Sequence, residues 1–146
     1  MTALDSIAPA CPTFSAAACR FLEAPRFAVV ATLNPDGSPL QAVIWYRLED
    51  DTIVFNSRLG RHWPTNIQRD RHVSITVVDG YDYIEMRGEV EIDEDPQLGQ
   101  AVIAGLTRRY ESNGEAAEAQ NAGFARERRV TFKLRPSRIF ERLSSN

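Results

Sequence analysis

The strongest constraint on the fold is a series of short, strand-like runs that follow one another without helices between them. Residues 27–33 (FAVVATL) and 39–48 (PLQAVIWYRL) flank the sequence Asn-Pro-Asp-Gly. Proline presets φ for a turn, and Gly37 supplies the left-handed position, so these runs are predicted to form a hairpin. A third run, 52–57 (TIVFNS), follows an acidic turn, and we expect the three strands to form a meander.

Later segments continue the same pattern and add helices. Further strands are predicted at 73–80, 81–92, 129–134 and 137–143. Helices are expected at 15–24, near Pro64, at 96–110 behind an Asp-Pro cap, and within 112–127. Because the strands run in consecutive hairpins with no βαβ alternation, the sequence favours a mainly β (α+β) antiparallel barrel flanked by helices over a doubly wound sheet.

Length and composition indicate one domain over residues 1–146. The chain has 146 residues, 43% of them apolar, which is enough to build one core. A net charge of −3 gives no general attraction to nucleic acid or to an anionic membrane. No apolar run approaches the roughly 20 residues of a membrane span, and the N-terminus lacks a secretion signal, so we expect a cytoplasmic protein. Cys11 and Cys19 are expected to be free thiols, since they lack CxxC spacing.

The cation chemistry of this chain is arginine chemistry. The sequence holds sixteen arginines and a single lysine, Lys133. Arginine forks suit phosphate or carboxylate but form no Schiff base. Motifs of dinucleotide folds, P-loop proteins, zinc proteases and hydrolase elbows are absent from the sequence. His62 and His72 have no cysteines or carboxylates at metal spacing, so we predict no metal site.

The loop at 56–66 (NSRLGRHWPTN) has the composition of an anion site. It carries Arg58 and Arg61 around a glycine and leads into a helix, whose first N–H groups attract anions. Further donors come from Ser57, Thr65 and Asn66. Either a phosphate site or a solvated basic turn explains this pattern. Trp63 among these arginines either packs down as a plug or stacks on a planar ligand.

The strand at 39–48 is apolar on both faces, because Val43, Ile44, Trp45 and Tyr46 are consecutive. In a small barrel one face belongs to the core, so the other is expected to meet a partner subunit or a flat aromatic ligand. Tyr81 and a second tyrosine two residues on raise the same alternatives, with ordinary packing as the third.

These blocks together resemble the split-β-barrel flavin and deazaflavin proteins of the pyridoxamine 5′-phosphate oxidase superfamily, and within it the coenzyme F420-dependent oxidoreductases of the flavin/deazaflavin subgroup B. The likeness spans about residues 14–143. It rests on FAVVATLNPDGSPLQAVIWY, FNSRLGRHWPTNIQRDRHVSI, YIEMRGEVEI, LTRRY and RRVTFKLRPSRIF. The resemblance implies a six- to seven-stranded split barrel with two to four flanking helices. It also implies a homodimer with a cofactor at the subunit interface.

The resemblance also implies which residues bind the cofactor. The ring is expected to lie along the strand at Gln41, Ala42, Val43, Ile44 and Trp45. The phosphate is expected to be held from Asn56, Ser57, Arg58, Arg61 and Asn66. Trp63 and Pro64 are further candidate cofactor-binding residues, with Trp63 at the wall of the site and Pro64 fixing the start of the helix. Where the deazaflavin subgroup often carries a lysine, this chain has Trp63. The arginine motif that binds pyridoxal phosphate in the vitamin B6 oxidases is absent from the C-terminal sequence.

The resemblance therefore implies a reductase that uses reduced F420 to transfer hydride to a planar conjugated small-molecule acceptor. Tyr81 is a candidate proton donor. The alternatives are an FMN-dependent oxidase or reductase on the same barrel, and a non-catalytic protein that binds a flavin, deazaflavin or haem-like ligand.

Overall fold

The computed structural model describes residues 13–144, so Cys11 lies outside the described residues, while Cys19 is a free thiol. The chain forms, in order, α1 (Ala16–Glu23), β1 (Ala28–Leu33), β2 (Pro39–Ile44), β3 (Arg47–Glu49), β4 (Thr52–Arg58), α2 (His62–Arg69), β5 (His72–Asp79), β6 (Asp82–Asp93), α3 (Pro96–Tyr110), α4 (Gly114–Phe124), β7 (Arg129–Leu134) and β8 (Arg138–Arg142). No helix among these is long and apolar enough to cross a membrane.

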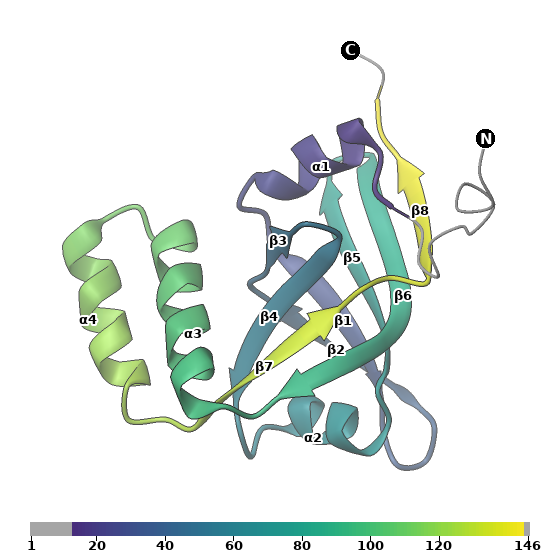
Figure 1. The fold of residues 1–146 in the computed structure, drawn as a ribbon. Helices are drawn as coiled ribbons and strands as arrows, with labels where there is room; N and C mark the ends of the chain where they lie inside the picture. Colours follow the sequence, from purple (N-terminus) through teal and green to yellow (C-terminus); the bar gives the residue numbers. More distant parts are fainter. Residues whose placement is uncertain (1–12, 145–146) are drawn as a thin grey trace, which may run out of the picture.

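All strand pairs are antiparallel, and the sheet curls into a barrel (Figure 1). The strand order is β2-β1-β5-β6-β7-β4-β3, and β8 pairs with β6 outside this path. β2 and β3 are consecutive in the chain but lie at opposite ends of that order, which requires the sheet to curve until its two ends approach. The predicted antiparallel barrel is confirmed.

The predicted turn and helix caps are confirmed. Gly37 has a φ of 85°, the left-handed value that the Asn-Pro-Asp-Gly turn requires. Ser15 caps α1 by accepting a hydrogen bond from the Ala18 N–H at 3.0 Å, and Asp95 caps α3 through the Gln97 N–H at 3.0 Å. The later strands and the two long helices lie within about three residues of their predicted positions.

The prediction of a single strand over residues 39–48, and of a meander that includes it, was wrong. The strand divides at Trp45 and Tyr46, and the second piece, β3, pairs with β4 instead of continuing beside β1. Tyr46 is fully buried, and its hydroxyl donates to the Leu22 carbonyl at 2.9 Å. Burial raises the pKa of Tyr46 to about 12, so the hydroxyl remains a donor at neutral pH.

Helices close the ends of the barrel and cover one side (Figure 1). α1 lies over one end and α2 over the other, while α3 and α4 form a pair beside β4 and β7. The core between them is apolar and includes Phe55, Phe132 and Met86, each fully buried. The arrangement leaves the loop after β4 and the start of α2 beside α3, where the candidate site is found.

Candidate functional site

A cavity of about 210 Å³ lies where β2, the β4–α2 loop, α3 and the start of β7 meet; we call it the arginine pocket. Six of the residues predicted to bind the cofactor line it: Val43, Ile44, Trp45, Asn56, Arg61 and Trp63. The structure therefore brings the predicted ring-binding strand and the predicted phosphate-binding loop to one cavity. The remaining lining residues, which sequence reasoning missed, are Ile103, Leu106, Phe124 and Arg129.

Arg129 is the missed residue with the most chemical consequence, because its guanidinium is buried at the wall of the pocket. The residue is 6% exposed. Its Nε donates to Asn56 Oδ1 at 2.8 Å, its Nη1 pairs with Glu127 Oε1 at 3.0 Å, and its guanidinium lies 4.9 Å from the centre of the Phe124 ring. Burial lowers the pKa of Arg129, and the Glu127 carboxylate opposes that shift. An arginine stays charged at neutral pH, so the pocket contains a fixed positive charge.

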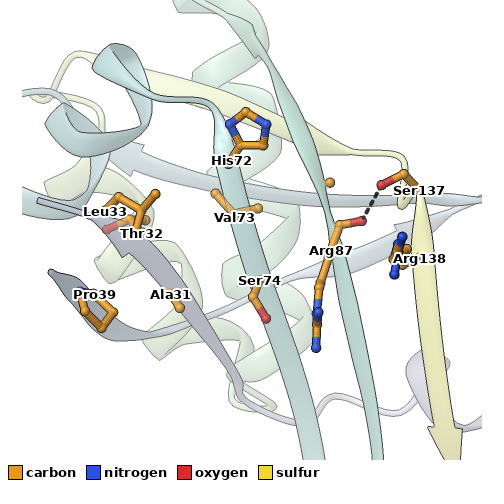
Figure 2. A pocket seen from close by; sticks show the side chains of 11 residues that line it. Ala31, Thr32, Leu33, Pro39, His72, Val73, Ser74, Arg87, Ser137 and Arg138 are labelled. Atoms are coloured by element: carbon orange, nitrogen blue, oxygen red, sulfur yellow. Dashed lines mark hydrogen bonds between the residues drawn. The ribbon is translucent and has the colours of Figure 1, made fainter. Parts of the chain in front are cut away.

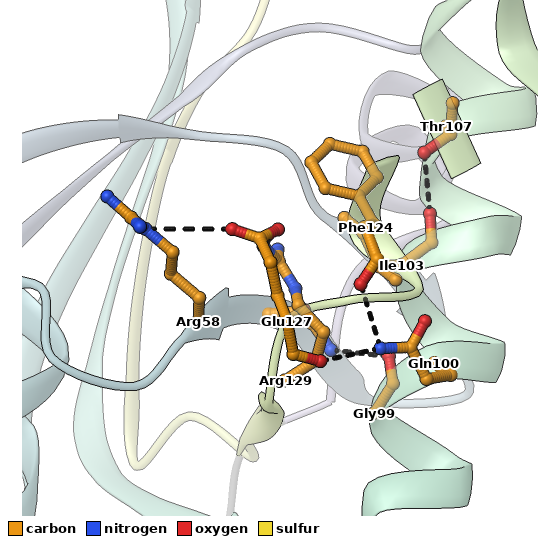
Figure 3. A network of polar contacts seen from close by, with 9 residues as sticks. Arg58, Gly99, Gln100, Ile103, Thr107, Phe124, Glu127 and Arg129 are labelled. Atoms are coloured by element: carbon orange, nitrogen blue, oxygen red, sulfur yellow. Dashed lines mark hydrogen bonds and ion pairs between the residues drawn. The ribbon is translucent and has the colours of Figure 1, made fainter. Parts of the chain in front are cut away.

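The surroundings of Arg129 hold it in place (Figure 3). Asn56 donates from Nδ2 to the Gly99 carbonyl at 3.0 Å, which ties β4 to α3. Gln100 donates to the carbonyls of Phe124 and Glu127 at 3.0 and 2.8 Å, which fixes the segment that leads into β7. A methyl group at Gly99 would clash with the Arg129 carbonyl, so glycine permits this close approach of α3 and β7.

The charge around the pocket is positive. Arg58 lies 3.7 Å from Glu127 Oε2, and Arg61 lines the pocket. No hydrogen bond or ion pair within residues 13–144 engages the Arg61 side chain. Arg58 and Arg129 both pair with the carboxylate of Glu127, whereas Arg61 has no carboxylate partner within the described residues. An excess of two positive charges suits a phosphate, which accepts charge-assisted bonds from guanidinium groups.

The start of α2 adds backbone donors beside Arg61. The helix begins at His62, and its cap residue Arg61 makes no side-chain capping bond. The first N–H groups of a helix lack partners within the helix and favour an anion. The predicted helix near Pro64 is confirmed, although Pro64 is its third residue and not its first.

Trp63 packs into the barrel as a plug, which was one of the two alternatives for this residue; the other was stacking on a planar ligand. It is 6% exposed, and its ring centroid lies 6.0 Å from that of Phe55 and 5.6 Å from that of Phe132. It also lines the arginine pocket. Trp45 also lines the pocket, and it stacks on Tyr110 with a 5.3 Å centroid distance and a 6° interplanar angle.

The other predicted site residues do not line the arginine pocket: Gln41, Ala42, Ser57, Arg58, Pro64, Asn66 and Tyr81. Asn66 is buried, and its Nδ2 donates to Thr32 Oγ1 at 3.1 Å and Asn34 Oδ1 at 2.9 Å, so it ties α2 to the first hairpin. Ser57 is also buried, and its hydroxyl has no partner within the described part of the chain. Tyr81 lies at the β5–β6 turn and is 91% exposed.

No group of three or more histidine, cysteine or acidic residues within residues 13–144 is arranged to hold a metal ion. His62 is exposed on α2, and His72 begins β5.

Comparisons with known proteins agree with this architecture. A solved structure named F420 reductase is 30% identical to this chain, with a TM-score of 0.69, and the match covers 83% of this chain and 94% of that one. A conserved hypothetical protein from Mycobacterium tuberculosis is 22% identical, with a TM-score of 0.75, over 92% of this chain and 87% of that one. A putative pyridoxamine 5′-phosphate oxidase from Listeria innocua is 17% identical, with a TM-score of 0.62, over 84% and 92% of the two chains.

The two less similar structures establish the fold alone, a split barrel of the same kind. No curated protein matches the chain. The model of the pyridoxamine 5′-phosphate oxidase family matches residues 14–142, which is nearly all of the barrel and its helices. This chain belongs to the pyridoxamine 5′-phosphate oxidase family.

Proposed function

We propose that this protein is a cytoplasmic, homodimeric oxidoreductase that uses reduced coenzyme F420 to transfer hydride to a planar, conjugated small molecule. The observation that carries the proposal is the arginine pocket, which places Arg61 and Arg129 beside the flat apolar surface of Val43 and Trp45. The 30% identity with a structure named F420 reductase supports F420 over FMN.

The residues of the pocket fit a phosphate-bearing tricyclic cofactor. Arg61, Arg129 and the first N–H groups of α2 form a donor set for the phosphate. Val43 and Trp45 offer a flat bed for the ring. Because this chain has Trp63 where the deazaflavin subgroup often has a lysine, the loop provides one positive charge fewer. Arg129 supplies a positive charge to the same pocket from β7.

The bound cofactor supplies the hydride; the protein binds and orients it. The arginine side chains would hold the phosphate end of the cofactor, which would fix the position of its ring along β2. The apolar wall of Ile44, Ile103 and Leu106 excludes water from that side of the cavity. Because Tyr81 does not line the pocket of its own chain, it serves as a proton donor only if it reaches the site of a partner subunit.

Titration of the purified protein with F420 and FMN tests the cofactor assignment. We expect tighter binding of F420. Arg61→Ala should weaken binding by about 10- to 150-fold, the equivalent of roughly 1.5–3 kcal/mol for a hydrogen bond to a charged group. Arg61→Lys should recover only part of the loss, because a point charge does not reproduce a fork.

Arg71→Ala is the matched control, since Arg71 is an exposed arginine just beyond α2 that does not line the arginine pocket. Tighter binding of FMN would overturn the choice of F420. Oxidation of reduced F420 should then be followed with unsaturated lactones, quinones and tetrapyrroles. Binding without turnover of any acceptor would favour a protein that sequesters the cofactor. Unchanged affinity in the Arg61 variants would leave the loop as a solvated turn.

The proposed homodimer rests on two observations. Val43 is 69% exposed on the outer face of β2, and Val78 on β5 and Phe140 on β8 are also exposed. The arginine pocket holds about 210 Å³, less than the roughly 300–1,000 Å³ of typical ligand pockets, so one chain builds only part of a cofactor site. A second copy packed on β2 would cover Val43 and complete the pocket.

Light scattering should give a mass about twice the 16.4 kDa of one chain. Val43→Glu should shift the protein toward monomer and weaken cofactor binding together, because a charge in the centre of an interface is costly. Glu49→Gln on β3 is the control. Val29 is not used for this purpose, because it lies opposite Val43 in the β1–β2 register. A monomer at every concentration would contradict the dimer.

A further inference from the structure

Glu127 places a carboxylate against two of the arginines around the arginine pocket (Figure 3). Its Oε1 lies 3.0 Å from Arg129 Nη1, and its Oε2 lies 3.7 Å from Arg58 Nε. Arg129 lines the pocket, whereas Glu127 and Arg58 do not. The carboxylate therefore offsets part of the positive charge that an anion in the pocket would meet.

The backbone and the sheet both hold Glu127 at this position. Its N–H donates to the Phe124 carbonyl at 2.9 Å, and its own carbonyl accepts from Gln100 Nε2 at 2.8 Å. Arg58 and Arg129 are direct partners in the β4–β7 register, where like charges destabilise a sheet. Because the Glu127 carboxylate relieves that repulsion, it is expected to stay beside the two arginines when a ligand enters the pocket.

The same contacts limit what Arg129 can offer to a ligand. A guanidinium binds an anion most strongly through two parallel N–H groups, from Nε and Nη2 or from Nη1 and Nη2. Asn56 Oδ1 accepts from Nε at 2.8 Å and Glu127 accepts from Nη1, so each pair has one nitrogen occupied. No hydrogen bond among residues 13–144 engages Nη2. Arg129 thus keeps its charge but has no free fork.

The positive excess at the wall of the pocket is small. Arg61 and Arg129 line the pocket, and the one carboxylate of Glu127 faces Arg129, so two positive charges meet one negative charge. Burial lowers the pKa of Arg129, Glu127 opposes that shift, and the charges of Arg61 and Arg58 add to it. A phosphate diester carries one negative charge, whereas a monoester carries about two near neutral pH and has three terminal oxygens. The wall therefore matches the diester.

We propose that Glu127 makes the arginine pocket selective for a cofactor whose phosphate is a diester, against a cofactor that ends in a phosphate monoester. The carboxylate repels the second negative charge of a monoester and occupies a nitrogen that the third oxygen would use. Such a repulsive element gives specificity without adding affinity for the favoured ligand. The inference rests on the proposed function, because F420 contains a phosphate diester and FMN a phosphate monoester.

Three flavins with the same ring isolate the charge of the phosphate: riboflavin, FMN and the methyl ester of FMN. The methyl ester is a diester with one negative charge, and riboflavin has no phosphate. Each is titrated against the whole chain by calorimetry. We expect the native chain to bind the methyl ester at least as tightly as FMN, although the methyl ester has the smaller charge.

Glu127→Gln should tighten the binding of FMN by at least about tenfold, because an amide of the same size no longer repels the second charge. The methyl ester should gain about threefold or less, and riboflavin should be unaffected. The preference between the two esters therefore reverses. Glu127→Asp retains the charge and should retain the preference for the methyl ester. Circular dichroism shows whether each variant is folded at the temperature of the titration.

Glu118→Gln is the matched control, since it makes the same change in net charge at a distance from the pocket. Glu118 is an exposed residue of α4 that pairs with Arg108 at 3.2 Å and does not line the arginine pocket. Both esters should keep their affinities within about twofold in this variant, because solvent screens an exposed pair.

Arg61→Ala separates the arginine pocket from another hollow in which a flavin could lodge. That hollow, of about 380 Å³, lies on the outer face of the sheet, which the proposed second subunit covers, and it shares no residue with the arginine pocket (Figure 2). Arg61→Ala should weaken the binding of both esters, in the native chain and in Glu127→Gln alike. Affinities that survive Arg61→Ala would overturn the proposed function and this inference together.

Other results would overturn the inference alone. These are equal gains of the two esters in Glu127→Gln, no binding of FMN by Glu127→Gln, loss of the preference in Glu127→Asp, and an equal change of preference in Glu118→Gln. A native chain that binds FMN at least about tenfold more tightly than its methyl ester would also overturn it. A native chain that binds FMN more tightly than F420, yet prefers the methyl ester to FMN, would overturn the choice of F420 and support the role of Glu127.

Discussion

Trp63→Ala is expected to lower the free energy of unfolding by about 3–5 kcal/mol, the usual cost of truncating a buried tryptophan. The indole is 6% exposed and packs with Phe55 and Phe132, so its removal leaves a cavity between α2 and the barrel. Urea denaturation followed by circular dichroism at fixed protein concentration measures the loss. Trp63→Lys should be at least as damaging, because it would bury an unpaired ammonium group.

Trp45→Ala is the matched control, because Trp45 also lines the arginine pocket but is only half-buried. Loss of its stacking on Tyr110 should lower the free energy of unfolding by about 0.5–1.5 kcal/mol, in addition to the contribution of the apolar area that Trp45 buries. Trp45→Ala should therefore weaken cofactor binding more than stability, and Trp63→Ala the reverse. Equal stability in the two variants would show that Trp63 is not part of the core.

The parts of the fold that could be predicted from the sequence are those set by local chemistry. Gly37 follows from the left-handed position of the turn, and the start of α3 follows from Asp95 and the proline after it. Each depends on atoms within about four residues, which a single sequence displays.

The break between β2 and β3 depends on distant atoms instead. Residues 39–48 have an unbroken strand pattern, but the Tyr46 ring lies in the core and its hydroxyl reaches α1. The chain thereby leaves β1 and joins β4. Nothing in the local alternation of apolar residues reports a hydrogen bond to a residue 24 positions away.

The candidate site shows the same division. Arg61 and Trp63 were found because the loop is contiguous and rich in arginine. Arg129 was missed because it reaches the pocket from β7, and its partner Asn56 lies 73 positions earlier. The local pattern gave no signal for it, since Arg129 shares one face of the strand RVTFKL with Thr131 and Lys133 and therefore looks like part of a polar face. Asn66 is the opposite case. It was predicted to bind the phosphate because it follows an arginine-rich loop, but its side chain joins α2 to the first hairpin.

Arg109 has no part in the pocket, yet its loss is expected to be as damaging as that of Trp63. Its guanidinium donates to four backbone carbonyls: Leu22, Glu23, Ala24 and Tyr46, at 3.0, 2.8, 3.0 and 3.0 Å. Three of these carbonyls belong to the C-terminal end of α1, where the helix has unpaired acceptors and a partial negative charge. The fourth belongs to Tyr46, in the corner between β2 and β3. One side chain on α3 thus fastens α1 and the β2–β3 corner together.

Arg109→Ala should lower the free energy of unfolding by about 3 kcal/mol or more, since hydrogen bonds to charged groups contribute roughly 1.5–3 kcal/mol each and four carbonyls would lose the guanidinium together. Arg109→Lys should recover less than half of the lost stability. A lysine ammonium group is a point charge and lacks the planar fork that reaches both α1 and the β2–β3 corner. The neighbouring Arg108 provides the control. It is exposed, and among residues 13–144 it pairs only with exposed Glu118 at 3.2 Å, so Arg108→Ala should change stability by about 0.5 kcal/mol or less.

The two arginine variants separate a structural role from a charge effect, because each removes one positive charge from the same turn of α3. If Arg108→Ala and Arg109→Ala destabilise the protein equally, the four carbonyl contacts contribute nothing beyond charge. If only Arg109→Ala destabilises the protein, the hydrogen bonds of the Arg109 guanidinium hold the β2–β3 corner. Because Trp45 follows β2 at this corner and lines the arginine pocket, the same variant should also weaken cofactor binding in the fraction that remains folded. Arg108→Ala should leave that binding unchanged.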